Sequence, residues 1–430
     1  MAKQTDIMLR TWTFYQVFPR QHSKTHDLKG VINDLDRIKD LGVDVIYVLP
    51  LHPIGKKARK GSQGSPYSIV NYREIHSDLG TMADFDRLVN EAHGRGLKVM
   101  MDIVFNHTSR DAVYVNSHPE WYIRNHQGEL ANRVGDWSDI ADLDFRQASL
   151  WDELIDVLCF WAKKVDGFRC DVAPLIPLDF WLKAREKVSI INPDMIWLSE
   201  SVHPGFIKYL RHLGFDCHSD AEMYQAFDIL YDYDIFDDMN HYLQDPQALK
   251  DWMISVDKQD VIYPANYIKL RSFEKHDQPR LRSKVRDEHH FKNMVALSFF
   301  MKGTAFIYAG MEHQVTHQPS LFEYDVIPWN QTTSLEPFFK RLAQFKKQPI
   351  FAYGHTLIHE HDGVVVMSHH YQNHAVVGVF NLEGKTEVKV PLIDGTYTNF
   401  IDEKEIIVTK GILPVYDEPI IIDTLKEHII

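Results

Sequence analysis

The chain repeats one unit, an amphipathic helix followed by a short apolar strand, and this repeat most constrains its fold. Residues 27–42, DLKGVINDLDRIKDLG, place apolar side chains near helical spacing and are followed by the β-branched run VDVIYVLP. Residues 81–96, TMADFDRLVNEAHGRG, repeat the pattern, with Thr81 and Asp84 in capping-box positions, and lead into LKVMMDIVF. Helices that alternate with buried strands require right-handed crossovers and predict a parallel sheet.

The number of repeats distinguishes a closed barrel from an open sheet, which has the same alternation. Eight such units over roughly 350 residues are typical of a (β/α)8 barrel with insertions. We therefore predict a (β/α)8 TIM barrel with strands near Phe14, Val45, Val99, Phe168, Ile196, Ile268 and Phe306, and a weaker one near Phe215.

Two segments depart from the repeat. Residues 108–145 are polar, rich in Asn, His and Asp, and predict an insertion after the third strand. After about Tyr353 the pattern changes to alternating runs such as GVVVMSHH and HAVVGVF, which predict a small antiparallel β domain. The predicted domains are thus a catalytic barrel of residues 1–107 and 146–352, an inserted subdomain of 108–145, and a C-terminal β-sandwich-like domain of 353–430.

Bulk properties exclude several functional classes. A net charge of -13 over 430 residues argues against nucleic-acid binding, which needs a concentrated basic face. The longest apolar stretch, Met294 to Met311, is interrupted by Lys302 and Gly303, so no membrane span is expected. The start of the chain lacks the apolar run of a signal peptide, and three unpaired cysteines suit a reducing compartment. We expect a cytoplasmic protein, and the sequence predicts no oligomeric state.

Charged and polar residues follow several of the predicted strands. In such barrels the active site lies at the carboxyl ends of the strands. A barrel rim has no structural need for several carboxylates close together, because their burial and mutual repulsion cost free energy. These side chains are therefore candidate site residues: Asp102, Asn106 and His107 on the third strand, Arg169 and Asp171 on the fourth, Glu200 on the fifth, and His276 and Asp277 on the seventh.

Two of the carboxylates suggest an acid and a nucleophile. Side chains alternate across the strand DGFRCDV, so Arg169 and Asp171 share a side, and the guanidinium is expected to hold Asp171 ionised at neutral pH. Glu200 follows the apolar run MIWLS, where a less solvated carboxyl retains its proton. One ionised carboxylate facing one protonated acid is the arrangement of retaining glycoside hydrolysis.

Four motifs in order make the chain resemble a known family. MDIVFNH, DGFRCDV, WLSES and FEKHD match in order and spacing the four catalytic regions of the α-amylase family of glycoside hydrolases. The resemblance covers essentially the whole chain, including the insertion and the C-terminal β domain. It implies that Asp171 is the nucleophile, that Glu200 is the general acid and base, and that Asp277 is the third carboxylate, which binds and distorts the sugar.

The resemblance also implies five substrate-binding residues. His107 and His276 would donate hydrogen bonds to hydroxyls of the glucose at the cleavage site, Arg169 would orient the nucleophile, and Asp102 would hold the local network. The segment GSPYSIVNY is similar to the family's stretch after the second strand, whose tyrosine, here Tyr67, stacks on that glucose.

A calcium site is the one cofactor question that the resemblance raises. DWSDIADLD is similar to the region that closes the family's inserted domain, and its Asp142 and Asn106 match positions that ligate calcium in many members. Other members keep both residues without binding metal, so both alternatives stay open. No organic cofactor is expected.

Two departures from the family pattern bear on specificity. Lys275 stands where the family most often has Asn, and VAPLIP follows Asp171 in place of the Lys-His pair of many starch-cleaving enzymes. The leading hypothesis is a retaining glycosidase of the α-amylase type that cleaves α-1,4 bonds in malto-oligosaccharides or related α-glucans. The alternatives are a transglycosylase, sugar isomerase or phosphorylase with the same intermediate, and a non-catalytic carbohydrate- or partner-binding barrel, which loss of a carboxylate would have favoured.

Overall fold

Eight parallel strands close into a barrel in this computed structural model, which describes residues 4–134, 136–330 and 333–430. The hydrogen-bonded order is β1-β10-β9-β8-β7-β6-β3-β2, so the predicted (β/α)8 fold class is confirmed. The barrel strands are β1 (Thr13–Val17), β2 (Val45–Val48), β3 (Lys98–Ile103), β6 (Gly167–Cys170), β7 (Ile196–Ser199), β8 (Ile229–Tyr231), β9 (Lys269–Arg271) and β10 (Thr304–Tyr308).

The weaker strand predicted near Phe215 is not a strand in the structure. Phe215 follows α8 (Pro204–His212) in a loop, and it packs against the buried cluster of Leu175, Val202, Leu210 and Cys217. The strand is instead β8, which pairs with β7 in parallel. An aromatic side chain that joins a cluster between loops has the same local signature as one in a short strand, so the prediction at Phe215 was wrong.

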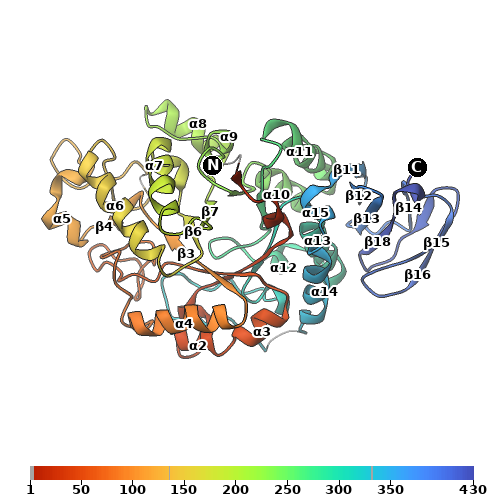
Figure 1. Cartoon of the computed structure of the whole chain (residues 1–430), viewed down its shortest axis with the longest axis horizontal. Helices are drawn as coiled ribbons and strands as arrows, with labels where there is room; N and C mark the ends of the chain where they lie inside the picture. The colour runs from red at the N-terminus through yellow and green to blue at the C-terminus, as the bar shows by residue number, and fades with distance from the viewer. Residues whose placement is uncertain (1–3, 135, 331–332) are drawn as a thin grey trace. The chain divides into compact units, whose positions relative to one another are not determined.

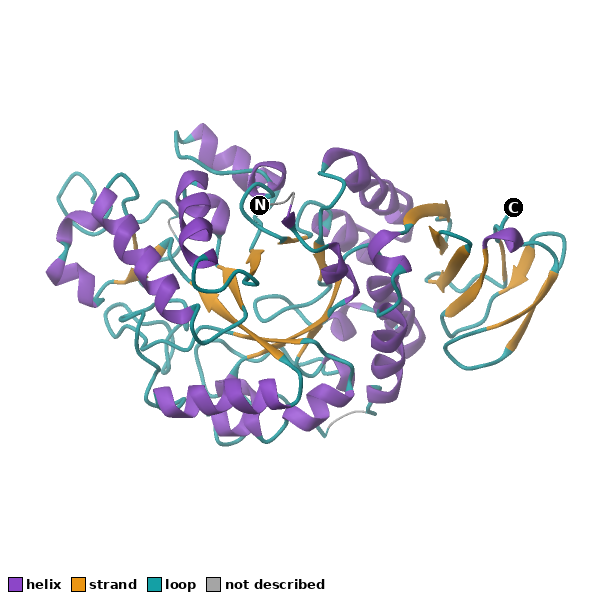
Figure 2. Cartoon of the chain, in the orientation of Figure 1, coloured by secondary structure: helices purple, strands orange, loops and turns teal. Residues whose placement is uncertain are grey.

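The chain forms two compact units, and the first consists mainly of Phe14–Tyr231 with Gln318–Pro328. Within it, helices α4, α6 and α7 lie outside the strands β3 and β6 (Figure 1; strands are orange and helices purple in Figure 2). Its helices are α1 (Pro19–His22), α2 (Leu28–Ile32), α3 (Leu35–Asp40), α4 (Met82–Gly94), α5 (Val113–Ser117), α6 (Ala148–Trp161), α7 (Leu178–Ser189), α8, and α9 (Asp220–Met223).

Local sequence explains where these elements begin. Helix α4 starts at the predicted capping box: the Asp84 main-chain N–H donates to the Thr81 hydroxyl at 3.2 Å, and the Thr81 N–H donates to the Asp84 carboxylate at 2.9 Å. All residues of β1, β2, β6 and β7 are buried, because the interior side chains and the outer helices cover both faces of the sheet.

The segment of the predicted insertion lies within the first unit, and a short strand pair joins its two ends. Strand β4 (His107–Ser109) pairs antiparallel with β5 (Ile140–Asp142), and His107 lies opposite Asp142 in the register. This pairing brings the two ends of the insertion together next to the end of β3. The loop between them contains α5 and one turn of 3-10 helix.

The second unit consists of Thr5–Thr13, Asp232–His317 and Trp329–Ile430. A sheet of order β11-β12-β13-β18 and two strand pairs, β14-β17 and β15-β16, form the antiparallel C-terminal β structure that the alternating runs predicted. The elements are α10 (Phe236–Gln244), α11 (Leu249–Ile262), α12 (Leu281–Lys284), α13 (Glu288–Phe300), α14 (Glu336–Lys346), α15 (Ile350–Tyr353), β11 (His355–Glu360), β12 (Val364–Tyr371), β13 (His374–Asn381), β14 (Glu387–Lys389), β15 (Gly395–Thr398), β16 (Glu405–Val408), β17 (Ile412–Pro414) and β18 (Ile420–Leu425).

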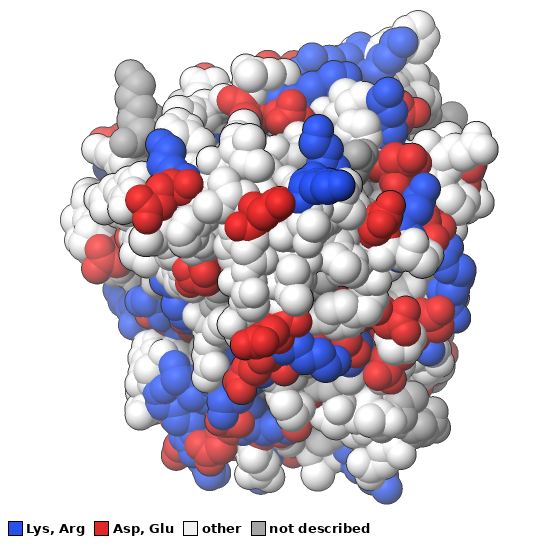
Figure 3. Space-filling model, turned by 90° about the vertical axis from the view of Figure 1, so that its right-hand side faces the viewer, with Lys and Arg blue, Asp and Glu red and all other residues white. Residues whose placement is uncertain are grey.

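The surface carries charges of both signs. On the face drawn in Figure 3, Lys and Arg side chains are interspersed with Asp and Glu. Across the part of the chain that the structure describes, no helix has the length and apolar character needed to cross a membrane.

Candidate active site

A single buried guanidinium binds three carboxylates at the carboxyl ends of neighbouring strands. From β6, Arg169 Nη1 donates to Asp102 on β3 (2.8 Å to Oδ1 and 3.0 Å to Oδ2) and to Asp171 Oδ1 at 2.9 Å. Its Nη2 forms an ion pair with Glu200 Oε1, just after β7, at 2.6 Å. Arg169 and Asp102 are fully buried, and Asp171 and Glu200 are less than a tenth exposed. The structure thus brings these four predicted residues together.

The sheet itself sets this arrangement. Asp102 and Arg169 are direct partners in the register of β3 and β6. Pairing continues past the strand ends, where the Asp171 N–H donates to Ile103 O at 2.8 Å and the Glu200 N–H to Cys170 O at 3.0 Å. The chain then turns at Val172, whose φ of 36° lies in the left-handed region that non-glycine residues rarely adopt. This turn directs the Val172 N–H to Glu200 Oε2 at 2.9 Å.

The electrostatics of Asp171 differ from the sequence-based argument. Burial, then repulsion from Glu200, raise the pKa of Asp171 well above its ordinary value, and Arg169 opposes that shift. Burial likewise raises the pKa of Asp102. We expected Arg169 to keep Asp171 ionised as its single carboxylate partner. In the structure three carboxylates share this guanidinium. A buried group of three carboxylates and one guanidinium favours binding of a proton, which an acid–base mechanism can use.

Tyrosines surround this cluster. The hydroxyls of Tyr47 and Tyr67 donate to Asp102 Oδ2 at 2.7 and 3.1 Å, and burial raises the pKa of both phenols. The Arg169 guanidinium lies 5.8 Å from the ring centre of Tyr67 and 5.7 Å from that of Tyr231. Sequence reasoning missed Tyr47 and Tyr231, because each stands in an apolar strand where an aromatic residue usually belongs to the core.

His107 lies beside the cluster at the base of the insertion. It is 5% exposed, and its Nδ1 is 3.1 Å from Asn106 Nδ2. Its ring centre is 5.8 Å from that of Trp137, a residue of the insertion. Burial lowers the pKa of His107, so the ring is a neutral hydrogen-bonding group at pH 7.

A guanidinium occupies the position where Asn106 and Asp142 were expected to hold calcium. Arg133 Nε donates to Asp142 Oδ2 at 2.8 Å, and Arg133 Nη2 donates to Asn106 Oδ1. Asp142 Oδ1 is buried without a hydrogen-bond partner, but the other oxygens already face a cation. Among the described residues, no group of three or more His, Cys, Asp or Glu side chains is arranged to hold a metal ion. This arrangement therefore does not fit calcium.

His276 and Asp277 belong to the second unit, where they follow β9. His276 is buried, and the Asp277 side chain is 43% exposed and paired with Lys275. The Lys275 side chain is fully buried, with Nζ 5.0 Å from the centre of the Tyr233 ring. Lys275, the departure from the family pattern, is thus an ion-pair partner of the predicted third carboxylate.

A buried ion pair anchors the loop that carries these residues. Glu274 accepts from Arg280 Nη1 at 2.9 Å and from the Leu281 N–H at 2.6 Å. Arg280 also donates to Ala309 O at 2.9 Å and lies 3.9 Å from the centre of the Tyr308 ring. Both partners are buried, and burial raises the pKa of Glu274 while Arg280 opposes that shift. We call this pair the Glu274–Arg280 clamp.

Known proteins match the chain over nearly all its length. The family model for the alpha amylase catalytic domain matches residues 16–137 and 117–350, and that for the bacterial alpha amylase C-terminal domain matches 356–422. The crystal structure of an alpha-amylase from Lactobacillus plantarum superposes with a TM-score of 0.94 at 41% identity, over 97% of this chain and 100% of that one. A maltogenic alpha-amylase from Thermotoga neapolitana gives a TM-score of 0.87 at 29% identity, over 97% and 99%.

Curated relatives match a shorter part. An alpha-1,4-glucan:maltose-1-phosphate maltosyltransferase from Myxococcus xanthus is 33% identical over 231 residues, which is 47% of this chain and 34% of that protein. The chain therefore spans about a third of the length of the curated relatives that it matches. Because family models cover both the barrel and the C-terminal domain, in the order found here, the chain belongs to the α-amylase family.

Proposed function

We propose that this protein is a retaining glycosidase of the α-amylase type that cleaves α-1,4 bonds in malto-oligosaccharides or related α-glucans. The observation that carries the proposal is the shared guanidinium of Arg169, which binds Asp171 and Glu200 at the ends of adjacent strands. Retaining glycosidases need two carboxyl groups of this kind, one ionised and one protonated, on either side of the scissile bond.

In the proposed reaction Asp171 is the nucleophile and Glu200 the acid and base. A carboxylate oxygen of Asp171 bonds to the anomeric carbon as the bond to the glycosidic oxygen breaks, and that oxygen takes the Glu200 proton. Glu200 then removes a proton from water, which attacks the anomeric carbon and releases Asp171. Arg169 orients Asp171, and Asp102 with its two tyrosine donors fixes the position of Arg169.

The remaining predicted residues take substrate-binding roles in this proposal. Asp277 is the third carboxylate, and His276 and His107 donate to sugar hydroxyls. Tyr67 presents its ring to the sugar while its hydroxyl is bound to Asp102. Tyr67 is a half-buried residue, which is compatible with that role.

Glycosyl transfer is the second candidate, and the curated relatives favour it. Several of them are named alpha-1,4-glucan:maltose-1-phosphate maltosyltransferases. The same covalent intermediate serves both reactions, and the product depends on whether water or a sugar hydroxyl accepts the glycosyl group.

Time-resolved product analysis of maltoheptaose tests both candidates, with and without added maltose 1-phosphate and with Asp171→Asn as the inactive control. Shorter products alone would support the hydrolase. Products longer than maltoheptaose, or consumption of maltose 1-phosphate, would support transfer. Absence of turnover with α-glucans of several lengths, or undiminished turnover by Asp171→Asn, would refute the proposed mechanism.

A further inference from the structure

Arg133 of the insertion contacts three separate segments of the first unit. Its Nε and its main-chain N–H donate to Asp142 Oδ2 at 2.8 and 2.9 Å, and its Nη1 donates to Leu175 O at 3.0 Å. Its Nη2 donates to Asn106 Oδ1. The Arg133 side chain is 9% exposed and that of Asp142 is 1% exposed, so solvent screens these contacts little. The guanidinium thus links the insertion to the end of β3 and to the loop after Asp171.

The chemistry of the guanidinium fixes the orientation of the Asn106 amide. Arginine has only donors, so the carbonyl oxygen of Asn106 must face Arg133 and its NH2 group must point away. That NH2 group is 3.1 Å from His107 Nδ1. Because an amide NH2 only donates, His107 Nδ1 must accept, and the proton of the neutral ring must be on Nε2.

We propose that Arg133 is a positioning residue that acts through Asn106 to hold His107 as the Nε2–H tautomer. The N–H of His107 then points away from Asn106, and the ring also hydrogen-bonds the main chain of Tyr67, which links it to the tyrosine proposed to contact the sugar. The substrate-binding part of this inference rests on the proposed function, whereas the tautomer is a property of the resting protein. The same guanidinium holds the insertion by hydrogen bonds and an ion pair, with no divalent ion required.

Nitrogen-15 NMR of the histidine rings tests the tautomer directly. The chain has 24 histidines, so His107 is assigned by comparison with His107→Gln. In the wild-type protein we expect an unprotonated Nδ1 and a protonated Nε2 at His107. A protonated Nδ1 in the wild-type protein would overturn the proposal whether or not the protein acts on glucans.

Asn106→Asp separates the tautomer from the tether. A carboxylate still accepts from Arg133, but it cannot donate to His107 Nδ1 and instead accepts a hydrogen bond from an Nδ1–H group. We therefore expect Nδ1 to become protonated, and kcat/KM for maltoheptaose to fall about 10- to 100-fold, while chelator leaves the thermal midpoint unchanged. An unchanged wild-type nitrogen pattern in Asn106→Asp would overturn the relay.

Arg133→Met removes the proposed cause, and Arg110→Met is its matched control. Arg110 also lies in the insertion and donates to two carbonyls, Ser138 O at 2.7 Å and Leu130 O at 3.0 Å, without contacting Asn106. We expect Arg133→Met to lose the single Nε2–H pattern at His107 and Arg110→Met to keep it. An unchanged pattern in folded Arg133→Met, or an equal loss in Arg110→Met, would refute the positioning role. If Arg133→Met does not fold, the wild-type and Asn106→Asp spectra still decide the matter.

Discussion

Neutralising Asp171 should stabilise the protein while it abolishes activity. Asp171 shares Arg169 with Asp102 and Glu200, so its charge is repelled by two buried carboxylates and compensated by a fraction of one cation. Like charges about 5 to 6 Å apart repel by about 3 kcal/mol per pair at an effective dielectric constant of 20, so the two neighbouring carboxylates oppose the Asp171 charge by about 6 kcal/mol, and attraction to Arg169 offsets about 4 kcal/mol of this. An asparagine in its place loses both terms but still accepts a hydrogen bond from Arg169. We therefore expect Asp171→Asn to gain about 1–2 kcal/mol.

Scanning calorimetry and activity measurements check this expectation together. For 430 residues the entropy of unfolding is about 0.9 kcal/mol/K, so the thermal midpoint should rise by about 1–2 °C. Activity on maltoheptaose should fall by at least about 10⁴-fold. Because the folded-state pKa of Asp171 is raised, its contribution to stability is largest at acid pH and is lost as the pH rises through that pKa. The gain from asparagine should therefore grow with pH.

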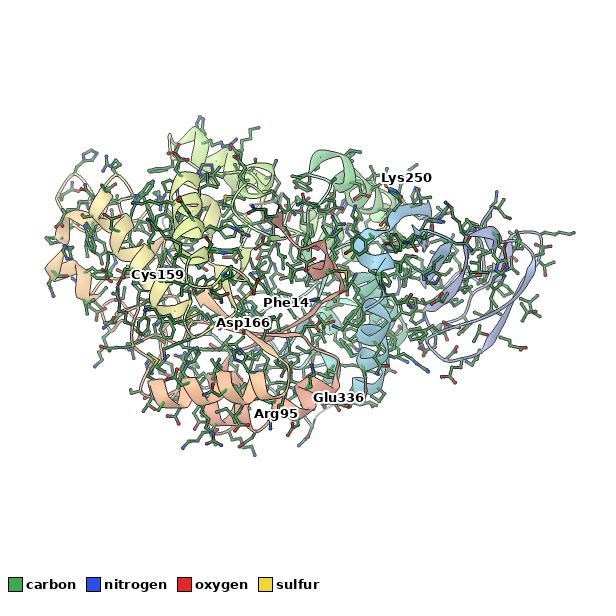
Figure 4. All side chains as sticks on the ribbon, viewed as in Figure 1. Phe14, Arg95, Cys159, Asp166, Lys250 and Glu336 are labelled. Carbon is green, nitrogen blue, oxygen red and sulfur yellow. The ribbon has the colours of Figure 1, made fainter. Side chains whose placement is uncertain are left out.

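Asp166, at the opposite end of β6, is the matched control. It accepts from the Val99 N–H at 2.8 Å and pairs with His93 at 2.7 Å (Asp166 is labelled in Figure 4). Residues at the amino-terminal end of a barrel contribute to stability, whereas the catalytic residues lie at the carboxyl-terminal end. Asp166→Asn should lower the midpoint by about 1–2 °C and keep activity within about twofold. A lower midpoint in Asp171→Asn, or unchanged activity, would refute the reasoning.

Three further substitutions test other parts of the structure. Arg169→Met leaves three buried carboxylates without a cation, so the free energy of unfolding measured in urea should fall by about 3–5 kcal/mol. A loss below about 1 kcal/mol would contradict the interpretation that the three carboxylates depend on this guanidinium. Burial raises the pKa of Asp232 from 3.8 to about 7, so its contribution to stability should fall as the pH rises from about 4 to about 7 and stay level above. Asp232→Asn should flatten this dependence between pH 5 and 7, and an unchanged slope would contradict it. Gly303 has a φ of 137°, and an added Cβ would lie 2.4 Å from Lys269 O. Gly303→Ala should therefore lower the free energy of unfolding by about 1–3 kcal/mol in the same urea assay, and a neutral effect would show that this turn relaxes.

The repeated helix–strand unit was sufficient to predict most of the barrel. Periodicity located seven strands to within a residue, because each was a short apolar run and most of these runs followed an amphipathic helix. It misplaced the eighth, since a short strand such as β8 and the loop at Phe215 both present aromatic side chains. Only pairing with β7 distinguishes them, and pairing is not a local property of the sequence.

The candidate site was predictable where charge interrupts apolar strands. Asp102, Arg169, Asp171 and Glu200 stand out for that reason, and the structure brings them together. Their protonation was not predictable, because it depends on how many carboxylates share the guanidinium. Arg133 had no signal at all in the sequence, since an arginine in a polar loop is ordinary until its three partners converge on it.

The Glu274–Arg280 clamp has a consequence for the thermodynamics of substrate binding. It holds the loop with His276 and Asp277 from within the folded chain, through buried contacts that need no ligand. The conformational entropy of that loop is therefore lost at folding, so under the proposed function less is lost when a sugar binds. For a glucan that contacts such a preorganised loop, a smaller entropy loss offsets the favourable binding enthalpy, so the affinity is higher. Weakening the clamp, for example by Glu274→Gln, should appear in calorimetry as a more unfavourable binding entropy.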